Sequence, residues 1–416
     1  MTARPSVRDV ARHAGVSVGT VSHVLNHPDR VAPATRERVE RVIAELGFVR
    51  STAARQLRDG ASSTVGLVLH DIANPFYTEA ARAVEDHLVE RGYALLLCST
   101  DGEQQREARA LRMLLEQDVA GVIVTPSAST DANLGDLRRR RTPVVLLDSP
   151  GDVPDLPSVG VDDLAGGRIA VSHLLARGHR SIVVLLGPMS VRQARQRWAG
   201  ACAGAREAGF DVDAVLRPVE CDAFSADAAA GAMRLVLTEP RRPTAVFAGN
   251  DIMAIGAMRV IRKAGLRIPD DIAVVGYDDV FVSAALVTPL TSVRQPLRDL
   301  GRTAAELVLR RIADGGEGEP QHVVFRPELV VRDSTGGRDR TARAPSRGPA
   351  RQASGTQDSA GLVQSPHDRA VRDLVADLHA VVSRAGRRPR PSRAATRRRN
   401  GRCTSRTGRS RSRREA

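Results

Sequence analysis

Apolar and polar residues alternate with a helical period at the start of the chain. Val7, Val10, Ala11 and Ala14 recur at i, i+3, i+4 and i+7, a spacing that places one apolar stripe along a helix. Ser6 stands where the N-cap of such a helix belongs, because its hydroxyl can accept a hydrogen bond from a backbone N–H. The pattern therefore predicts a first short helix over these residues.

A tight turn and a second helix follow at once. Gly15 can take the left-handed conformation that ends a helix, and Ser17 can cap the next one. The second helix would bury Val21, Val24 and Leu25. Such a corner lets the second helix project into a major groove, so the pattern predicts a DNA-reading element.

A third helix is predicted over residues 34–46, with an apolar inner face and arginines outside. The polar segment FVRSTAARQLRDG follows it and separates the helices from the rest of the chain. The pattern thus predicts an all-α N-terminal helix-turn-helix domain over residues 1–49 and a linker over residues 50–60.

From residue 65 onward the pattern changes to short apolar runs separated by helical segments. Alternation of this kind is typical of parallel sheets covered by helices on both faces. The predicted strands begin at residues 65, 93, 121, 144, 181, 245 and 272. The predicted helices between them cover residues 77–91, 103–117, 163–177 and 251–264. Two such lobes fit the length, so we expect an α/β core over residues 61–334.

Polar side chains follow several of these runs. In doubly wound sheets ligands bind beyond the carboxyl ends of the strands, which makes these side chains candidates for a binding site. Asp71 and Asn74 follow the run at 65, Asn250 follows the run at 245, and Asp278 lies at the end of the run at 272. Their oxygens accept hydrogen bonds and therefore suit a polyhydroxylated ligand.

Charge is distributed unevenly along the chain. The formal net charge is +14, but residues 335–416 hold 21 arginines against six acidic residues. Residues 1–58 hold ten arginines against five acidic residues, and residues 59–334 are net acidic. A basic head on an acidic body indicates that, within residues 1–334, only the N-terminal part meets phosphate.

Enzyme and metal signatures are misplaced or incomplete. GVSVG at residues 15–19 fits the G-x-S-x-G nucleophile elbow, which needs a preceding strand, whereas a polar helix precedes it here. Lys263 is the single lysine and follows arginine, so no Walker A sequence is present. His23 and His27 are four residues apart but lack the HExxH glutamate, and the four cysteines show no CxxC spacing. We expect no enzyme, no metal and no cofactor.

These features resemble the LacI/GalR family of transcriptional regulators. The resemblance covers roughly residues 5–332 and rests on SVRDVARHAGVSVGTVSHVLN, on the NPF element in HDIANPFY and on the cross-over segment VTPLTSVRQP. It implies a two-lobed, periplasmic-binding-protein-like α/β core behind the helix-turn-helix domain. The implied lobes are an N-lobe of about 61–161 and 292–322 and a C-lobe of about 162–291 and 323–334.

In this family the second helix reads bases with its first two residues and with one a turn and a half later. That pattern falls on Val18, Gly19 and His23, and because Gly19 has no side chain, readout would depend on the other two. Further DNA contacts are implied, mostly to phosphate, and we count Ser17 with them: Ser6, Ser17, Thr20, Ser22 and Asn26. The linker resembles a hinge helix that forms when two chains meet over the minor groove. Leu57 would be its wedge and Ala53 and Ala54 its small contact residues.

The resemblance also assigns effector contacts. Arg197, in RQRWAG, matches an arginine that holds hydroxyls or carboxylates, and its five-donor fork suits a polyhydroxylated or anionic ligand. Phe224 matches an aromatic residue that stacks on a sugar or base. The expected effector site comprises Asp71, Asn74, Phe76, Arg197, Phe224, Asn250 and Asp278.

Other interpretations of these residues stay open. Asp278 and Asp251 could be helix N-caps, which is the usual place of an acid after a strand. Arg197 could be a surface ion-pair partner, Phe224 could belong to the core, and His23 could be a solvated side chain.

The tail, residues 335–416, is rich in Arg, Ser, Ala, Gly and Pro, and we expect it to stay mostly disordered. Within it, residues 371–382 keep a helical apolar spacing that indicates one short amphipathic helix. The basic tail is either a non-specific DNA attachment segment or an appendage without that role, such as translation of a shifted frame.

The sequence therefore predicts a homodimeric repressor that binds a palindromic operator and changes affinity when a small molecule, a sugar or related metabolite, closes the core. No run of about 18 apolar residues and no signal peptide is visible, so we expect a cytoplasmic protein without a membrane partner. A solute-binding protein would need an export signal in place of the DNA head. A nucleoid-like DNA coater would bind all sequences alike.

Overall fold

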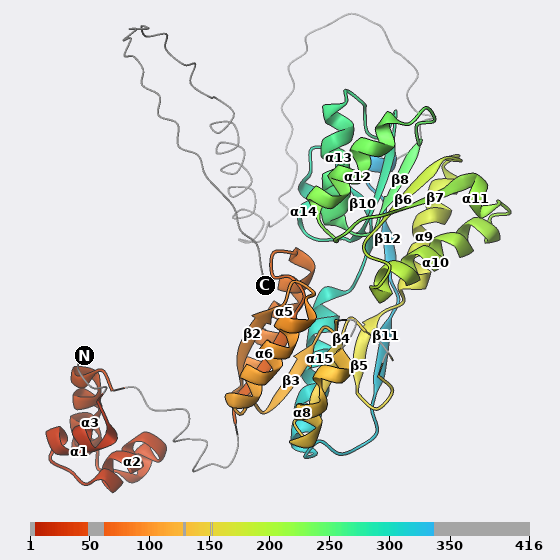
Figure 1. Cartoon of the computed structure of the whole chain (residues 1–416). Coiled ribbons are helices and arrows are strands. Elements are labelled where there is room, and N and C mark those ends of the chain that lie inside the picture. Colours follow the sequence, from red (N-terminus) through yellow and green to blue (C-terminus); the bar gives the residue numbers. More distant parts are fainter. Residues whose placement is uncertain (1–4, 49–61, 128–129, 150, 152, 337–416) are drawn as a thin grey trace, which may run out of the picture. The chain divides into compact units, whose positions relative to one another are not determined.

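The computed structural model describes residues 5–48, 62–127, 130–149, 151 and 153–336. Its N-terminal helices are α1 (Val7–Ala14), α2 (Val18–Asn26), the short 3-10 helix η1 (Pro28–Arg30) and α3 (Pro33–Leu46) (Figure 1). They enclose one small core whose buried members are Val10, Ala11, Ala14, Val21, Val24, Val39 and Val42. The apolar stripes predicted from the helical period are confirmed, with Val7 and Leu25 only partly buried.

Two predicted helices concern residues that the structure does not describe. The expected hinge helix, with Ala53, Ala54 and Leu57, lies outside the described residues, as does the expected helix within 371–382. The predicted tail boundary is corrected by two residues, because the folded core continues through Gly336. Ser334 and Thr335 are buried, and Ser334 donates a hydrogen bond to the carbonyl of Val274 at 2.6 Å.

Six parallel strands form the first sheet, in the order β11-β5-β4-β3-β1-β2. They are β1 (Thr64–Leu69), β2 (Ala94–Ser99), β3 (Gly121–Val124), β4 (Val144–Leu147), β5 (Ser158–Val161) and β11 (His322–Phe325). Side chains alternate between the faces: Leu67 packs with α5 (Pro75–Val89) and α15 (Leu297–Ala313), whereas Val68 packs with α6 (Gln104–Glu116) and α8 (Gly135–Arg139). Each fully buried aliphatic side chain stabilises the fold by about 1.5–3 kcal/mol.

The second sheet has the order β12-β10-β9-β8-β6-β7, and only β12 runs antiparallel to its neighbour. Its strands are β6 (Ile182–Leu186), β7 (Leu216–Glu220), β8 (Ala245–Ala248), β9 (Ala273–Asp278), β10 (Thr291–Arg294) and β12 (Glu328–Val330). Helices α9 (Asp163–Ala176) and α10 (Arg192–Glu207) cover one face, and α12 (Ala226–Thr238) and α13 (Asp251–Lys263) the other. The shorter helices of the two lobes are α7 (Thr130–Asn133), α11 (Val212–Val215), α14 (Val282–Ala285) and η2 (Asp333–Thr335).

Glycines allow α9 and α10 to approach closely. A Cβ atom on Gly167 would lie 2.1 Å from the backbone oxygen of Arg197, and one on Gly200 would lie 2.0 Å from that of Leu164. Real atoms cannot approach so closely, so any side chain at either position would push the helices apart. The close packing is what brings Arg197 beside the first turn of α9.

The chain passes between the two sheets three times, after β5, after β10 and after β11 (Figure 1). The lobe borders predicted at 291/292 and 322/323 are therefore too early by three residues each. Backbone hydrogen bonds explain the difference, because β10 pairs with β9 as far as Arg294 and β11 pairs with β5 as far as Phe325. The crossing after β5 lies where it was predicted.

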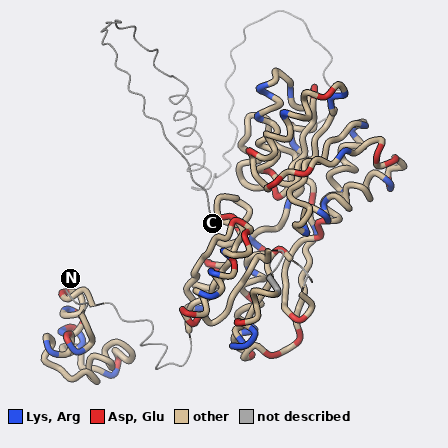
Figure 2. Tube along the Cα trace, viewed as in Figure 1, with Lys and Arg blue, Asp and Glu red and all other residues tan. Residues whose placement is uncertain are grey.

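The seven predicted strands and four predicted helices are all present, with ends shifted by a few residues. Charged residues of both signs are spread over the two lobes (Figure 2). No helix in the described part of the chain is both long enough and apolar enough to cross a membrane.

Candidate functional site

The N-terminal helices begin with a reciprocal cap. The Ser6 hydroxyl accepts a hydrogen bond from the Asp9 backbone N–H at 3.3 Å, and the Asp9 carboxylate accepts one from the Ser6 N–H at 2.9 Å. The Ser6 hydroxyl also donates a hydrogen bond to Asp9 Oδ2 at 2.6 Å, and this bond, together with the one from the Ser6 N–H, holds the pKa of Asp9 below its ordinary value. A capped N-terminus stabilises a helix by about 1 kcal/mol. Ser6 thus has a structural role besides the DNA contact predicted for it.

The corner between the first two helices forms as predicted. Gly15 ends α1 with a φ of 62°, in the left-handed region, and Ser17 caps α2 by accepting a hydrogen bond from the Thr20 N–H at 3.0 Å. Because Val21 and Val24 are buried, the opposite side of α2 faces outward. Val18, Gly19 and His23 all lie on that exposed side.

The other predicted DNA-contacting residues of α2 are joined by local hydrogen bonds. The Asn26 side-chain amide donates to the Ser22 carbonyl at 2.7 Å and to the Ser22 hydroxyl at 3.1 Å. The Thr20 and Ser17 hydroxyls lie 2.9 Å apart. These bonds fix the orientation of the side chains before any phosphate arrives. The expected hinge contacts of Ala53, Ala54 and Leu57 lie outside the described residues.

Three residues predicted for the effector site follow β1, and each has a local partner. The exposed Asp71 accepts a hydrogen bond from the Ala73 N–H at 2.7 Å, which closes a turn. Asn74 caps α5 by accepting from the Phe76 N–H at 3.0 Å. Phe76 is buried in the core of the first lobe. Each of the three side chains thus has a structural role that does not require a ligand.

Asp148 and Gln193 join the two lobes. Asp148 follows β4 in the first sheet, and Gln193 lies in α10 of the second lobe. The Gln193 side-chain amide donates to the Asp148 carbonyl at 2.7 Å and to its Oδ2 at 2.9 Å, and both side chains are buried. Burial, together with the charge of Asp163, raises the pKa of Asp148 to about 7.

Arg197 lies at the centre of the buried polar residues of the second lobe. Its Nε donates to Asp163 Oδ1 at 2.8 Å, its Nη1 donates to the Gly249 carbonyl at 2.5 Å, and its guanidinium carbon lies 3.7 Å from the centre of the Tyr277 ring. The side chain is 5% exposed and that of Asp163 is 1% exposed. Burial lowers the pKa of Arg197, but the charge of Asp163 outweighs it and raises the pKa overall. The interpretation of Arg197 as a surface ion-pair partner is wrong.

Asp278 ends β9 and is not a helix N-cap. Its backbone φ is 106°, and its buried side chain accepts a hydrogen bond at Oδ1 from the Gln295 amide at 2.7 Å. Burial raises the pKa of Asp278 well above its ordinary value, and the charge of Arg197 opposes this. Asp278 therefore shares an electrostatic environment with Asp148 and Arg197.

The two residues after β8 have structural partners. Asn250 caps α13 by accepting from the Met253 N–H at 2.8 Å. Asp251 lies in the first turn and is not the N-cap that one interpretation made it. It accepts hydrogen bonds from the Ser283 and Ser292 hydroxyls, both at 2.6 Å, and from a backbone N–H at 3.0 Å. It thereby ties α13 to α14, to the residues just before α14 and to β10.

Phe224 follows β7 and packs partly buried on the core of the second lobe. Its ring covers Gly187, where a Cβ atom would lie 2.3 Å from a ring carbon, and it reaches Gly249 after β8. The ring thus lies over the carboxyl ends of two strands. Both interpretations of Phe224, core residue and stacking surface, fit this position.

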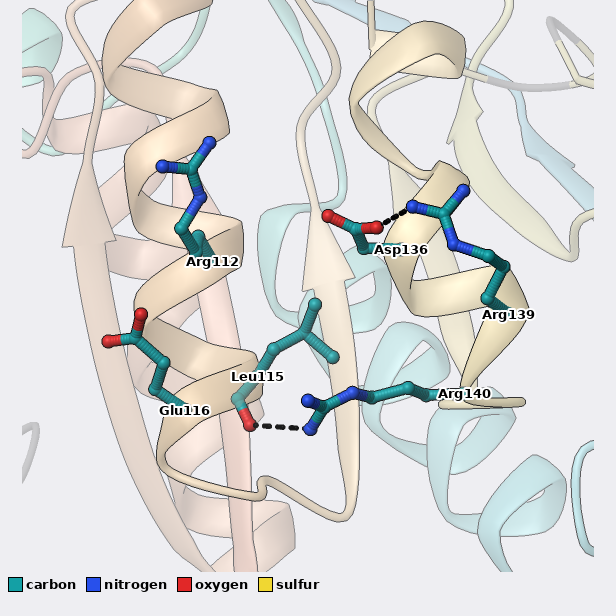
Figure 3. A pocket seen from close by; sticks show the side chains of 6 residues that line it. All are labelled: Arg112, Leu115, Glu116, Asp136, Arg139 and Arg140. Carbon is teal, nitrogen blue, oxygen red and sulfur yellow. Dashed lines mark hydrogen bonds and ion pairs between the residues drawn. The ribbon is translucent and has the colours of Figure 1, made fainter.

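A separate surface pocket of about 270 Å³ lies between α6 and α8 and is lined by three arginines and two acidic residues (Figure 3). Arg139 is paired with Asp136, and Arg140 donates to the Leu115 carbonyl at 3.4 Å. None of the predicted effector residues lines this pocket. We do not assign the effector to it.

Sequence reasoning missed several residues of the buried polar cluster, namely Asp148, Asp163, Gln193, Tyr277 and Gln295. Asp148 directly follows the predicted strand at 144, so the rule that selected Asp278 could have selected it too. Gln193 and Gln295 carry no comparable signal, because their partners are set by the folding of distant segments. Among the described residues, no group of three or more potential metal ligands is present.

Comparison with known proteins identifies close relatives. The profile of "Bacterial regulatory proteins, lacI family" matches residues 6–51, and that of a "Periplasmic binding protein-like domain" matches residues 171–335. The ribose operon repressor of Escherichia coli (strain K12) is 37% identical over 330 residues, which cover 79% of this chain and 99% of the repressor. The transcriptional repressor PurR of Aliivibrio fischeri (strain ATCC 700601 / ES114) is 35% identical over 338 residues, covering 80% and 99%.

Solved structures agree with these relatives. The Lac repressor dimer bound to operator and the anti-inducer ONPF matches with a TM-score of 0.68 at 31% identity, covering 80% of this chain and 99% of that one. The complex of the transcriptional regulator CelR with cellobiose matches with a TM-score of 0.59 at 34% identity, covering 80% and 100%. The chain therefore belongs to the LacI family of bacterial regulatory proteins.

Proposed function

We propose that the protein is a homodimeric transcriptional repressor that binds a palindromic operator through residues 1–58. The exposed side of α2 carries this proposal, because Val18, Gly19 and His23 face outward from a helix whose other side packs in the core of the domain. The dimeric, operator-bound Lac repressor structure supports the same arrangement for this chain. A regulator of this kind acts where the DNA is, and we place it in the cytoplasm.

A small-molecule effector is proposed to bind at the buried polar cluster around Asp148, Arg197 and Asp278. Two similar proteins have sugars in their names, the ribose operon repressor and the CelR–cellobiose complex. We therefore propose a sugar or related metabolite. Of the residues expected from the sequence, we keep Arg197, Phe224 and Asp278 as contacts and assign local structural roles to Asp71, Asn74, Phe76 and Asn250.

Effector binding would control DNA binding through the linker. A ligand that contacts both lobes favours one arrangement of the lobes over another. The change in operator affinity is limited by the difference between the ligand's affinities for the two arrangements. Two hinge helices, each with Leu57 as a minor-groove wedge and Ala53 and Ala54 at their contact, would pair in one arrangement and separate in the other.

Operator binding tests the proposal directly. DNase footprinting upstream of the protein's own gene would locate the site, and fluorescence anisotropy would compare it with scrambled DNA. We expect a preference of about 10³ or more for the operator. His23→Ala should weaken operator binding by about tenfold or more and relax selectivity at one base position, because a good base contact contributes about 1–3 kcal/mol.

His179→Ala is the matched control. His179 lies in the second lobe, where it contacts the Thr244 hydroxyl, so its loss should leave DNA binding unchanged. A monomeric protein, or equal affinity for all duplexes, would contradict the proposed function.

A further inference from the structure

Two histidines lie next to each other on the exposed side of α2. The ring centres of His23 and His27 are 6.4 Å apart, and the ring planes cross at 75°. Both side chains are exposed, as expected for residues one turn apart on the same face of a helix. His23 is a predicted base contact, whereas the predicted DNA contacts do not include His27. The geometry nevertheless places both rings on the surface that is proposed to meet DNA.

The backbone of His27 is held in place, while both rings are free of hydrogen bonds. The His27 N–H donates to the His23 carbonyl at 2.7 Å, and the His27 carbonyl accepts from the Arg30 N–H at 2.9 Å. Within the described part of the chain, no hydrogen bond or ion pair engages the ring of His23 or His27. By contrast, Nδ1 of His13 lies 2.8 Å from the Asp9 carbonyl oxygen. The ring nitrogens of the pair are therefore available to an external partner.

The charged groups around the pair do not hold a proton on either ring. None of them forms an ion pair with His23 or His27 in the described domain, and Asp9 is paired with Arg12. The C-terminal end of α2 favours positive charge on both rings, whereas two charged rings so close together repel each other. The charged or titratable side chains on the elements that pack against α2 are Arg8, Asp9, Arg12 and His13 of α1, Asp29 and Arg30 of η1, and Arg36, Glu37, Arg38, Glu40, Arg41 and Glu45 of α3.

Duplex DNA supplies the negative charge that offsets this repulsion. Asn26, a predicted phosphate contact, directly precedes His27, so a phosphate group at Asn26 would lie near the His27 ring. Protonated imidazole donates hydrogen bonds from both nitrogens, whereas neutral imidazole donates from only one. Phosphate oxygens, and O6 and N7 of guanine, are acceptors. Both kinds of DNA partner therefore favour the charged form of a ring.

We infer that His27 contacts the DNA backbone beside His23, and that operator binding takes up protons at this pair of histidines. The inference rests on the proposed function and adds a contact residue and a pH dependence to its DNA-binding surface. Histidine is the side chain whose charge ordinarily changes between pH 5 and 8. Because the bound state holds more protons than the free state, operator affinity rises as the pH falls through this range.

Fluorescence anisotropy of the full-length protein on its footprinted operator, at pH 6, 7 and 8 and constant ionic strength, tests the inference. We expect binding to be about tenfold tighter or more at pH 6 than at pH 8. The logarithm of the affinity should also fall more steeply with the logarithm of the salt concentration at pH 6, by about 0.9 for each phosphate that a protonated ring neutralises. Calorimetry in two buffers of different ionisation enthalpy counts the protons. Binding without proton uptake would overturn the inference.

Two substitutions at His27 separate its charge from a structural role. His27→Gln cannot be protonated and should lose most of the gain in affinity at low pH. His27→Lys is charged at every pH used, so it should match the wild type at pH 6 and bind the operator more tightly than the wild type at pH 8. Equal weakening of both variants at every pH would show that the residue only shapes the end of α2, and would overturn the inference.

A double variant and a matched control locate the protons. His23→Gln combined with His27→Gln should give a flat pH profile. His13→Gln is the control, because His13 is exposed on α1 of the same domain and its ring lies at the Asp9 carbonyl. It should keep the wild-type profile. A profile that persists in the double variant, or one that disappears in His13→Gln, would contradict the assignment to the pair.

The same measurements distinguish this inference from the proposed function. A strong preference for the operator that does not change with pH would leave the repressor proposal intact and sink only the inference about protons. Proton uptake on duplex DNA of any sequence, with no preferred site, would sink the operator proposal while His27 remained a DNA contact.

Discussion

Two aspartates that follow strands of the same sheet differ sharply in their surroundings. Asp71, after β1, is exposed and accepts a hydrogen bond from a backbone N–H two residues away. Asp148, after β4, is buried and is bonded to Gln193 of the other lobe. The position after a strand places a polar residue at the ligand-binding edge of the sheet. Whether its side chain closes a local turn or joins the buried polar cluster depends on the residues that it contacts.

The largest expected effect comes from breaking the buried ion pair of that cluster. Asp163→Asn would remove the direct ion-pair partner of the buried Arg197 guanidinium, and we expect the free energy of unfolding to fall by about 3–5 kcal/mol. Urea denaturation measures this. Asp299→Asn, which breaks an exposed pair with Arg302, should cost about 0.5 kcal/mol or less. Equal losses in the two variants would show that burial does not distinguish these regions.

A smaller effect is expected from the pH dependence of Asp148. Because its pKa in the folded protein is raised to about 7, the native state holds a proton that the unfolded chain releases near pH 4. The stability that this group contributes is therefore complete below about pH 4 and is lost as the pH rises through 7.

Asp148→Asn cannot titrate, so it should lose less stability over this range. Between pH 5 and 8 we expect the wild type to lose roughly 2 kcal/mol more than the variant, after allowance for water penetration. Urea titrations at several pH values provide the measurement, and parallel curves would contradict it. Asp71→Asn, at the exposed turn, serves as the control and should follow the wild type.

The smallest effect concerns the segment after β1. Asn74→Ala removes the cap of α5 and should lower the free energy of unfolding by about 1 kcal/mol. Effector affinity should stay within about threefold, because the Asn74 side-chain oxygen is used by the Phe76 N–H. A large loss of affinity with unchanged stability would restore Asn74 to the effector site.

The sequence pattern was sufficient for the DNA-reading helices. Their caps and stripes depend on residues at most four positions apart, and so Ser6, Gly15 and Ser17 could be assigned from spacing alone. The strong apolar runs of the core were also visible. Five strands, β5, β7, β10, β11 and β12, were missed because each is only three to five residues long and carries at least one polar residue, which leaves a weak apolar pattern.

The effector site was only partly predictable. Family resemblance pointed to Arg197 and strand ends pointed to Asp278, but neither indicates that Arg197 already has Asp163 as its partner. That pairing joins α9 and α10, whose approach depends on glycines 30 or more residues from their contacts. Tertiary contacts of this kind leave no local pattern in the chain.

The three backbone connections between the lobes have a mechanical consequence. A single tether would allow one lobe to swivel and slide freely on the other, whereas the segments after Val161, Arg294 and Phe325 must all move together. Two of them leave from Val161 and Phe325, which are paired in neighbouring strands. Three connections allow fewer relative motions than one, so we expect the lobes to move by bending about this set of connections, and a ligand that favours one bend would shift the lobe next to the DNA-binding end in a single direction.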